Sequence, residues 1–425
     1  MRSLLFLILA GFLLTPASAQ IPADDLPGLV AGVSDEVLAW RRDIHANPEL
    51  GNQEFRTAGI VASHLESLGM EIHTGIAYTG VLGILRGGKP GKTVALRADM
   101  DALPVTEQTG LAFASTVTTQ YNGREVGVMH ACGHDTHVAI LMGVAEILAS
   151  RQADLEGTVM FIFQPAEEGG GGARLMLEEG LFEIMKPDAV LGLHVGPGQE
   201  AGQIGFVTRG AMAASDGLRI TVKGVQTHGA YPWRGVDPIV VASQIVLGLQ
   251  TIPSRQTDAT KAPAIVTIGQ IQGGVRGNII PAEVTMIGTI RTLDPDMQDD
   301  IHARIERTAT LIAESAGATA EVQINRGYPV TFNDPELTRS SVAALRAALG
   351  ASNVVEGVPA MGAEDFSYFA NEVPGFYFWL GGRTPGVSID GVATNHSPFF
   401  TVDEAALDVG VRAMTTAALS FLAND

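Results

Sequence analysis

The chain has 425 residues, of which 46% are hydrophobic, and it carries 27 basic and 46 acidic side chains. This hydrophobic content excludes a disordered protein and provides a large core, which at this length divides into two or more domains. The net charge of −19 argues against nucleic acid and anionic membrane surfaces as partners, since both are themselves negatively charged.

The first residues have the pattern of a secretory signal. Arg2 is followed by an apolar stretch from Leu4 to Leu14 and by small residues at positions 17–19. About eleven apolar residues are too few to span a bilayer, which takes roughly 20. We expect cleavage after Ala19 and export to the periplasm or the medium. No later segment reads as apolar enough to span, so we also expect a soluble mature protein.

The chain then continues with two helical patterns, each with a hydrophobic face, which start near Ser34 and Thr57. Next, β-rich runs alternate with helices. The runs lie at 93–104, 157–173 and 188–198, and the helices lie at 137–150 and 173–180. Such alternation predicts an α/β domain with a mixed, mostly parallel sheet that is covered on both faces.

The pattern changes between about Gly210 and Arg326. The elements predicted there follow the order strand, helix, strand, strand, helix, strand, at 217–224, 237–250, 264–271, 283–292, 297–317 and 320–325. This order fits a ferredoxin-like unit inserted into the larger domain. We therefore predict a signal peptide at 1–19, a larger domain in two parts at 20–209 and 327–425, and an inserted α+β domain at 210–326.

Polar side chains follow the predicted strands of the larger domain. Asp99 and Asp101 end one strand, Glu167 and Glu168 follow another, and His194 ends a third. Ligands of open α/β sheets bind in the crevice outside the carboxyl ends of the strands, so these segments can converge there. Taken singly, the glutamate pair is typical of a solvated loop, the aspartates of turn caps, and the histidine of a buried core residue.

The only cysteine of the chain adds to this set. Cys132 and His134 precede the helix predicted at 137–150, which would lie beside the same strand ends. A lone cysteine is more often a small buried hydrophobe, but here it stands between histidines. Thiolate, imidazole and carboxylate together suit a divalent ion such as zinc, with manganese, cobalt or nickel as alternatives.

A series of short motifs occurs in a fixed order after the signal: RADMDALP, MHACGHDTH, FQPAEEGGGGA, GLHVGP, THGAYPW, GVDPI, NIIP, GTIRT, GAEDFSYF and NHSPFF. Together they resemble the metal-dependent amidohydrolase branch of the aminoacylase and carboxypeptidase family. That branch includes hippurate hydrolases, N-acyl-amino-acid amidohydrolases and hydrolases of indole-acetyl-amino-acid conjugates. The resemblance covers nearly the whole chain after the signal.

The resemblance implies a site for two divalent metal ions. Carried over residue by residue, it names as ligands Cys132, His134, Glu168, His194 and His396. It makes Glu167 the general base. This division is chemically sensible, because a carboxylate held off the metals can take the proton of an activated water and deliver it to the leaving amine.

The resemblance also assigns roles to the inserted domain, which it implies is a lid and dimerisation domain. His228 would donate to the developing oxyanion, in its own chain or from a second subunit, although a plain turn residue fits the same position. Asn278 and Arg291 would contact the substrate's carbonyl or carboxylate. A homodimer or higher homo-oligomer is therefore expected.

These features predict an exported enzyme that hydrolyses the amide of an N-acyl amino acid. An exported dipeptidase or carboxypeptidase is the alternative within enzymes, and a non-catalytic binding protein on the same fold is the alternative outside them. Neither nucleic acid nor, after signal cleavage, a membrane is an expected partner.

Overall fold

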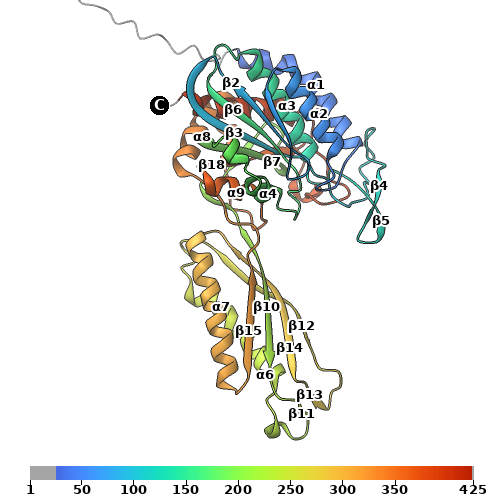
Figure 1. The fold of residues 1–425 in the computed structure, drawn as a ribbon, viewed down its shortest axis with the longest axis vertical. Coiled ribbons are helices and arrows are strands. Elements are labelled where there is room, and N and C mark those ends of the chain that lie inside the picture. The colour runs from blue at the N-terminus through green and yellow to red at the C-terminus, as the bar shows by residue number, and fades with distance from the viewer. Residues whose placement is uncertain (1–24, 424–425) are drawn as a thin grey trace, which may run out of the picture.

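The computed structural model describes residues 25–423, so the predicted signal peptide lies outside the described residues and its cleavage stays a prediction. The described chain forms two units (Figure 1). One contains both ends of the described chain and the larger sheet, and the other projects from it as an elongated body built on a second sheet.

The larger sheet has eight strands in the order β1-β2-β6-β3-β7-β18-β8-β17. Parallel pairing joins β6, β3, β7 and β18 in its centre, while β1 and β2 are antiparallel at one edge. The sheet is therefore mixed and mostly parallel, as the sequence predicts. The strands are β1 Glu71–Ile76, β2 Gly80–Arg86, β3 Lys89–Asp99, β6 Glu156–Gln164, β7 Ala189–Glu200, β8 Ile204–Phe206, β17 Val354–Glu356 and β18 Gly375–Arg383.

Helices cover both faces of this sheet because successive residues of its central strands point to opposite sides and are apolar on each. Leu96 and Phe161 pack into one core, and Ala95 and Ile162 pack into another. The helices of the first face are α1 Leu26–Ala46, α2 Phe55–Ser67, α3 His134–Ser150, α8 Pro335–Leu349 and α10 Ala406–Ala423. The second face carries α4 Gly172–Glu178, α5 Leu181–Ile184 and α9 Phe366–Glu372.

Helix α10 corrects one expectation from the sequence. Ala406–Ala423 is long and apolar enough, by length and composition, to cross a membrane, so the expectation that no later segment qualifies is wrong. In the fold, however, 61% of this window is buried, and α10 packs against α1, α3 and α8. Its apolar character is explained by this position in the core, since a helix that is hydrophobic all round is suited to burial.

The second unit carries a four-stranded antiparallel sheet in the order β12-β14-β10-β15. Its elements are β10 Ala214–Lys223, α6 Pro238–Thr251, β12 Ala264–Gly273, β14 Glu283–Thr292, α7 Pro295–Ser315 and β15 Thr319–Asn325. The two helices and the inner residues of the sheet form a separate hydrophobic core. Along the chain the order is strand, helix, strand, strand, helix, strand.

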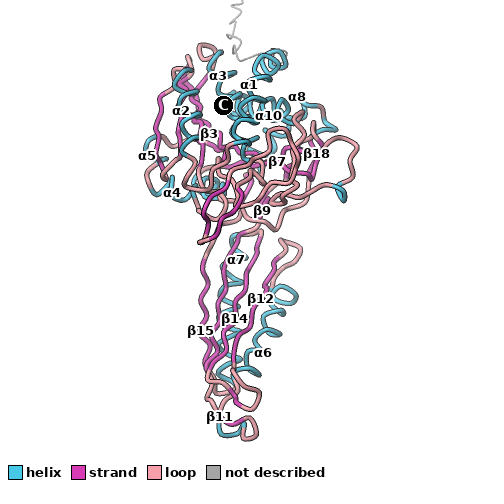
Figure 2. Tube along the Cα trace, turned by 90° about the vertical axis from the view of Figure 1, so that its right-hand side faces the viewer, coloured by secondary structure: helices cyan, strands magenta, loops and turns pink. Residues whose placement is uncertain are grey.

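Two chain segments connect the units, one leading into β10 and one leaving β15 (Figure 2). On the side of the first unit they pass through β9 Arg209–Met212 and β16 Thr331–Asn333, which pair antiparallel. The far end of the second unit carries the short pair β11 Thr227–His228 and β13 Ile279–Ile280 (Figure 1). A further hairpin, β4 Thr118–Tyr121 with β5 Arg124–Gly127, projects from the first unit.

The contact between α1 and α3 generates a stability prediction. A Cβ added at Gly143 of α3 would lie 2.5 Å from Cγ2 of the buried Val37, whereas one added at Gly32 of α1 would meet nothing within 4 Å. We expect Gly143→Ala to lower the free energy of unfolding by about 1–3 kcal/mol through overpacking. Gly32→Ala should raise it by about 0.4–1 kcal/mol. Denaturant unfolding of both variants checks this, and equal effects would contradict the close packing of α1 on α3.

Candidate metal centre

A cavity of about 780 Å³ opens at the carboxyl ends of the central strands of the larger sheet. Its lining includes polar and ionisable side chains from segments far apart in the sequence: Cys132, Glu167, Glu168, His194, Arg291, Tyr328, Glu364, Asn395 and His396. The fold thus brings the predicted strand-end residues to one place, where the crevice of an open α/β sheet is expected.

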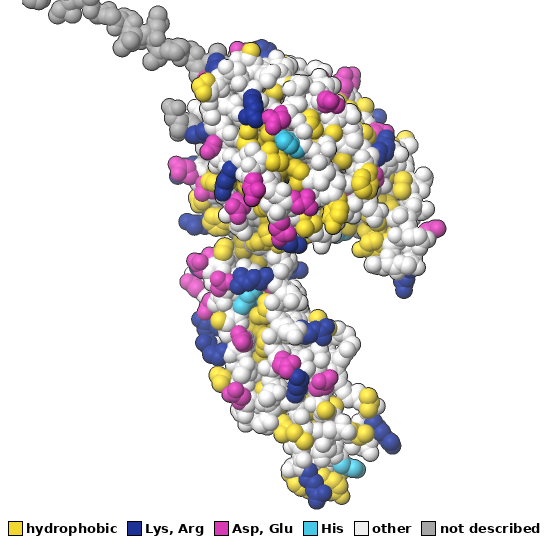
Figure 3. Space-filling model, viewed as in Figure 1, with side chains coloured by type: hydrophobic (Ala, Val, Ile, Leu, Met, Phe, Trp, Pro, Cys, Tyr) yellow, Lys and Arg dark blue, Asp and Glu magenta, His cyan; other side chains and the backbone are white. Residues whose placement is uncertain are grey.

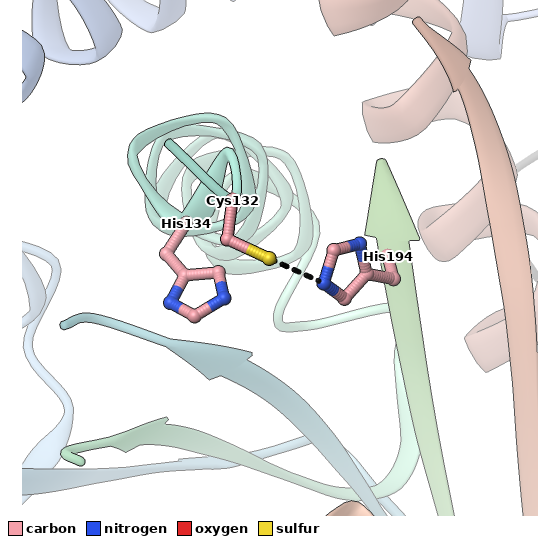
Figure 4. A group of neighbouring side chains, drawn as sticks. All are labelled: Cys132, His134 and His194. Atoms are coloured by element: carbon pink, nitrogen blue, oxygen red, sulfur yellow. Dashed lines mark hydrogen bonds between the residues drawn. The ribbon is translucent and has the colours of Figure 1, made fainter. Parts of the chain in front are cut away.

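Cys132 and His194 line this cavity, and His134 lies next to them, with the ligand atoms of all three within 4.8 Å of one another (Figure 4). Cys132 lies in the turn before α3, His134 is the first residue of α3, and His194 lies on β7. The Sγ atom of Cys132 is 3.4 Å from Nε2 of His194. Gly133 permits this turn, because its φ is +90° and a Cβ there would lie 2.4 Å from Cγ1 of Val195.

Hydrogen bonds fix how these two histidines present their rings. Nδ1 of His134 donates to the carbonyl of Asp101 at 2.8 Å, and Nδ1 of His194 donates to the carbonyl of Val195 at 2.8 Å. A carbonyl can only accept, so both rings, when neutral, carry an Nε2 lone pair. Nε2 of His134 is buried with no hydrogen-bond partner among the described residues. An orphaned lone pair beside a thiol fits a metal ligand, and a backbone carbonyl on the other ring nitrogen is the usual support of one.

His137 lies one turn further along α3 and is arranged differently. Its Nδ1 lies 2.5 Å from Oδ1 of Asp99, and its Nε2 accepts the backbone N–H of Val195 at 2.8 Å. Both ring nitrogens are therefore engaged, and no lone pair remains for a metal. His137 instead supports the strand β7 next to His194.

A second group of ligand atoms adjoins the first and shares Cys132 with it. Nε2 of His396 lies 2.9 Å from Oε1 of Glu168, and both come within 4.8 Å of the Cys132 sulfur. His396 is held by its backbone N–H, which donates to the carbonyl of Ala131 at 2.8 Å. All five predicted ligands are thus neighbours. Two groups that share a thiolate suit two adjacent divalent ions.

Burial raises the pKa of the Cys132 thiol to about 12, so without a cation the group is a neutral thiol. A divalent ion bound to the sulfur reverses this preference, because a coordinating thiol is deprotonated outright. The sulfur is therefore suited to a metal and poorly suited to act as a free nucleophile.

Glu167 and Glu168 are adjacent in sequence but have different environments. The backbone N–H groups of both donate to the carboxylate of Asp101 at 3.0 Å, which fixes the loop. Burial, together with the charges of Glu364 and Asp365, holds the pKa of Glu167 well above its usual range. Burial also acts to raise the pKa of Glu168, but the hydrogen bond from His396 and the charges of His134 and His396 together outweigh it, so the pKa is lowered. Glu168 is thus the better anionic ligand, and Glu167, with its higher pKa, is the stronger proton acceptor.

A network of buried ion pairs adjoins the cavity, and one of its members, Glu364, also lines it. The Arg97 side chain contacts the carboxylates of Asp99 at 2.6 Å, Glu364 at 2.9 Å and Asp365 at 3.0 Å. All four side chains are almost fully buried. The sequence pattern placed Asp99 among the strand-end residues expected at the crevice, with a turn cap as the alternative, and did not single out the other three residues, although they lie in the RADMD and GAEDF motifs.

Of the three remaining predicted residues, Arg291 lies at the cavity, whereas His228 and Asn278 lie far along the second unit. Arg291 of β14 reaches the cavity, and its Nη1 is buried without a hydrogen-bond partner among the described residues. His228 and Asn278 lie at β11 and β13, at the far end of the second unit (Figure 1). They neighbour each other there, since the backbone N–H of Gly229 donates to the carbonyl of Asn278 at 2.8 Å.

The contrast between His134 and His137 gives a matched test of the metal assignment. We expect His134→Asn to lower the number of divalent ions bound per chain, because it removes the free Nε2 lone pair. His137→Asn should keep the wild-type metal content, although it removes two hydrogen bonds worth about 0.5–1.5 kcal/mol each. Elemental analysis of both purified variants checks the pair, and metal loss only in His137→Asn would reverse the assignment.

Comparisons with known proteins agree with this geometry. The model of peptidase family M20/M25/M40 matches residues 95–420. Thermostable carboxypeptidase 2 of Saccharolobus solfataricus is 41% identical over 398 residues, which cover 92% of this chain and 97% of that protein. N-acetyl-L-cysteine deacetylase of Bacillus subtilis is 36% identical over 382 residues, which cover 90% and 87%.

A solved structure is similar over the same length. The crystal structure of a dinuclear metal binding peptidase from Bacillus subtilis is 35% identical, has a TM-score of 0.78, and matches 92% of this chain and 99% of its own. The family match spans both units of the fold and every residue of the cavity named above. The chain therefore belongs to peptidase family M20/M25/M40 and is a hydrolase that acts on amide bonds.

Proposed function

We propose that this protein hydrolyses the amide bond of N-acyl amino acids with the help of two divalent metal ions. The observation that carries the proposal is the cluster of five predicted ligand side chains at the cavity, with Glu167 next to them. The ligands would be Cys132, His134, Glu168, His194 and His396. Zinc or manganese fits this mixture of donors, with cobalt or nickel as alternatives. The dinuclear metal site of the Bacillus subtilis peptidase supports the same number of ions.

When bound, the ions would polarise the scissile carbonyl and lower the pKa of water to near neutrality. The remaining work falls to residues of this chain. Glu167 takes the proton of the attacking water and passes it to the leaving nitrogen, which converts a poor leaving group into a free amine. Its raised pKa suits the first of these steps, because a carboxylate with a higher pKa is a stronger proton acceptor.

The cavity walls indicate a substrate with one anionic end and one apolar end. Arg291 offers a guanidinium that can clamp a carboxylate through two hydrogen bonds. Other parts of the lining are apolar, at Phe206, Met212, Val358 and Trp379. An N-acyl amino acid with a hydrophobic acyl group matches both features.

A carboxypeptidase or dipeptidase activity is the alternative, and it is favoured by the name of the relative from Saccharolobus solfataricus. Both activities cleave an amide next to a carboxylate, so the metal ligands do not separate them. Hydrolysis rates for N-acetyl, N-benzoyl and indole-acetyl amino acids, compared with unblocked dipeptides, discriminate between the two.

The two adjacent glutamates test the division of roles. Glu167→Gln keeps size and hydrogen bonding but cannot accept a proton, so we expect normal metal content with kcat reduced by about 10² to 10⁴. Glu168→Gln should lower metal content, since a neutral amide is a poorer ligand than a carboxylate. Metal stoichiometry and kcat of both purified variants are the measurements. If Glu167→Gln loses metal and Glu168→Gln keeps it, the roles are exchanged.

We further propose that the second unit acts as a lid and dimerisation domain and that His228 serves the site of a second copy. Its position at the far end of the unit supports a role between chains (Figure 1). That end also exposes apolar side chains beside basic ones (Figure 3), with Tyr231, Trp233 and Val275 exposed by 47%, 74% and 96%. Such a surface suits association with another protein chain.

Mixing two inactive variants tests this sharing of a site. His228→Ala should lower kcat by about 10² to 10³ at normal metal content, because one oxyanion donor is removed. If His228 acts between chains, refolding His228→Ala with Glu167→Gln in equal amounts should restore activity to about a quarter of wild type, since half the dimers are mixed and each has one complete site. Activity that stays at the level of the single variants would place His228 within its own chain.

A further inference from the structure

Tyr328 connects the second unit to the loop that carries the proposed base. It lies on the segment between β15 and β16 and lines the cavity. Its hydroxyl donates to the backbone carbonyl of Glu167 at 2.7 Å and accepts the backbone N–H of Gly171 at 3.0 Å. One side chain thus closes both ends of the turn from Glu167 to Gly171.

This turn needs external support because its backbone is unusual. Ala166 has a φ of +49°, and Gly169 and Gly171 also have positive φ values. A non-glycine residue in this region is strained and persists only where its surroundings hold it. The first unit supplies two supports, since the Glu54 carboxylate accepts the N–H of Ala166 at 2.9 Å and Asp101 holds the two glutamate N–H groups. Tyr328 supplies a third from the connection to the second unit.

The Tyr328 backbone is itself fixed to the start of β10 in the second unit. The N–H of Ser215 donates to the Tyr328 carbonyl at 2.9 Å, and the Tyr328 N–H donates to Oγ of Ser215 at 3.2 Å. The neighbouring Gly327 N–H donates to the buried carboxylate of Asp216 at 3.2 Å. Because its backbone is bonded to β10 and its hydroxyl to the Glu167 loop, Tyr328 has a defined position relative to both units.

We propose that Tyr328 is a positioning residue for hydrolysis. Its hydroxyl sets the orientation of the Glu167 peptide and couples this peptide to the end of the second unit that joins the first. The inference rests on the proposed role of Glu167 as the general base. A proton acceptor must lie within hydrogen-bonding reach of the proton it takes, so a small rotation of this peptide lowers the rate of the chemical step. Metal binding is affected little, because Asp101 and His396 still hold Glu168.

The test is Tyr328→Phe, which removes only the hydroxyl. We expect kcat to fall about tenfold, from the loss of two hydrogen bonds that hold the base, with KM within about twofold of wild type and metal content unchanged. Tyr368→Phe is the matched control. The hydroxyl of Tyr368 donates to the carbonyl of Gly327 at 3.3 Å, and its ring centroid lies 6.0 Å from that of Tyr328, but within the described part of the chain its hydroxyl makes no hydrogen bond to the Glu167 loop. It should keep kcat within about twofold.

The double variant Tyr328→Phe with Glu167→Gln separates positioning from general destabilisation. If Tyr328 acts through the base, its removal should cost no further activity once Glu167 is neutral, so the two effects are not additive. Unchanged kcat in Tyr328→Phe, metal loss in that variant, or additive effects would each overturn the inference. The proposed function fails on a different result, namely full activity of Glu167→Gln alone.

Discussion

The buried guanidinium of Arg97 connects the segments that build the cavity. It contacts Asp99 at the end of β3 and both Glu364 and Asp365 before α9, and its Nε donates to Gln164 at the end of β6 at 2.8 Å. The chain of contacts continues from Asp99 to His137 and from there to the backbone of Val195 beside His194. Removing one partner of such a buried ion pair typically costs about 3–5 kcal/mol, because a charge is left uncompensated. The geometry of the proposed metal ligands depends on this network remaining intact.

The same network gives the cavity its electrostatic character. One guanidinium faces three carboxylates, and several neutral donors complete the hydrogen bonds, among them the Tyr377 hydroxyl at 2.5 Å from Glu364. Negative charge therefore remains in excess next to the cavity. Burial, together with this excess, holds the pKa of Glu167 high, and the excess favours cations beside it, where the proposed ligands His134, His194 and Cys132 lie. The excess negative charge thus contributes both to the base strength of Glu167 and to the preference of the neighbouring site for cations.

The sequence was sufficient to predict the mixed, mostly parallel sheet and to propose a ligand set at its strand ends, but it did not predict the buried residues that hold these side chains in place. Alternating strands and helices predicted the sheet, and placing acidic and histidine residues at strand ends predicted where they would meet. Periodicity could not distinguish His134 from His137, because the difference lies in which backbone groups their rings reach. Arg97, Tyr328 and Asp365 were not predicted as site residues, since their partners lie 100 or more residues away in some cases and only the folded chain brings them together. His228 was predicted by resemblance, and its distance from the cavity could be seen only in the fold.

The central claim is that divalent ions held by the cysteine, histidine and glutamate cluster are required for amide hydrolysis. The most direct measurement is the metal content of the purified wild-type chain beside its turnover of N-acyl amino acids, before chelation, after chelation, and after zinc or manganese is returned. The account predicts two ions per chain, loss of turnover when they are removed, and recovery when they are restored. Full turnover by a chain freed of metal would contradict it.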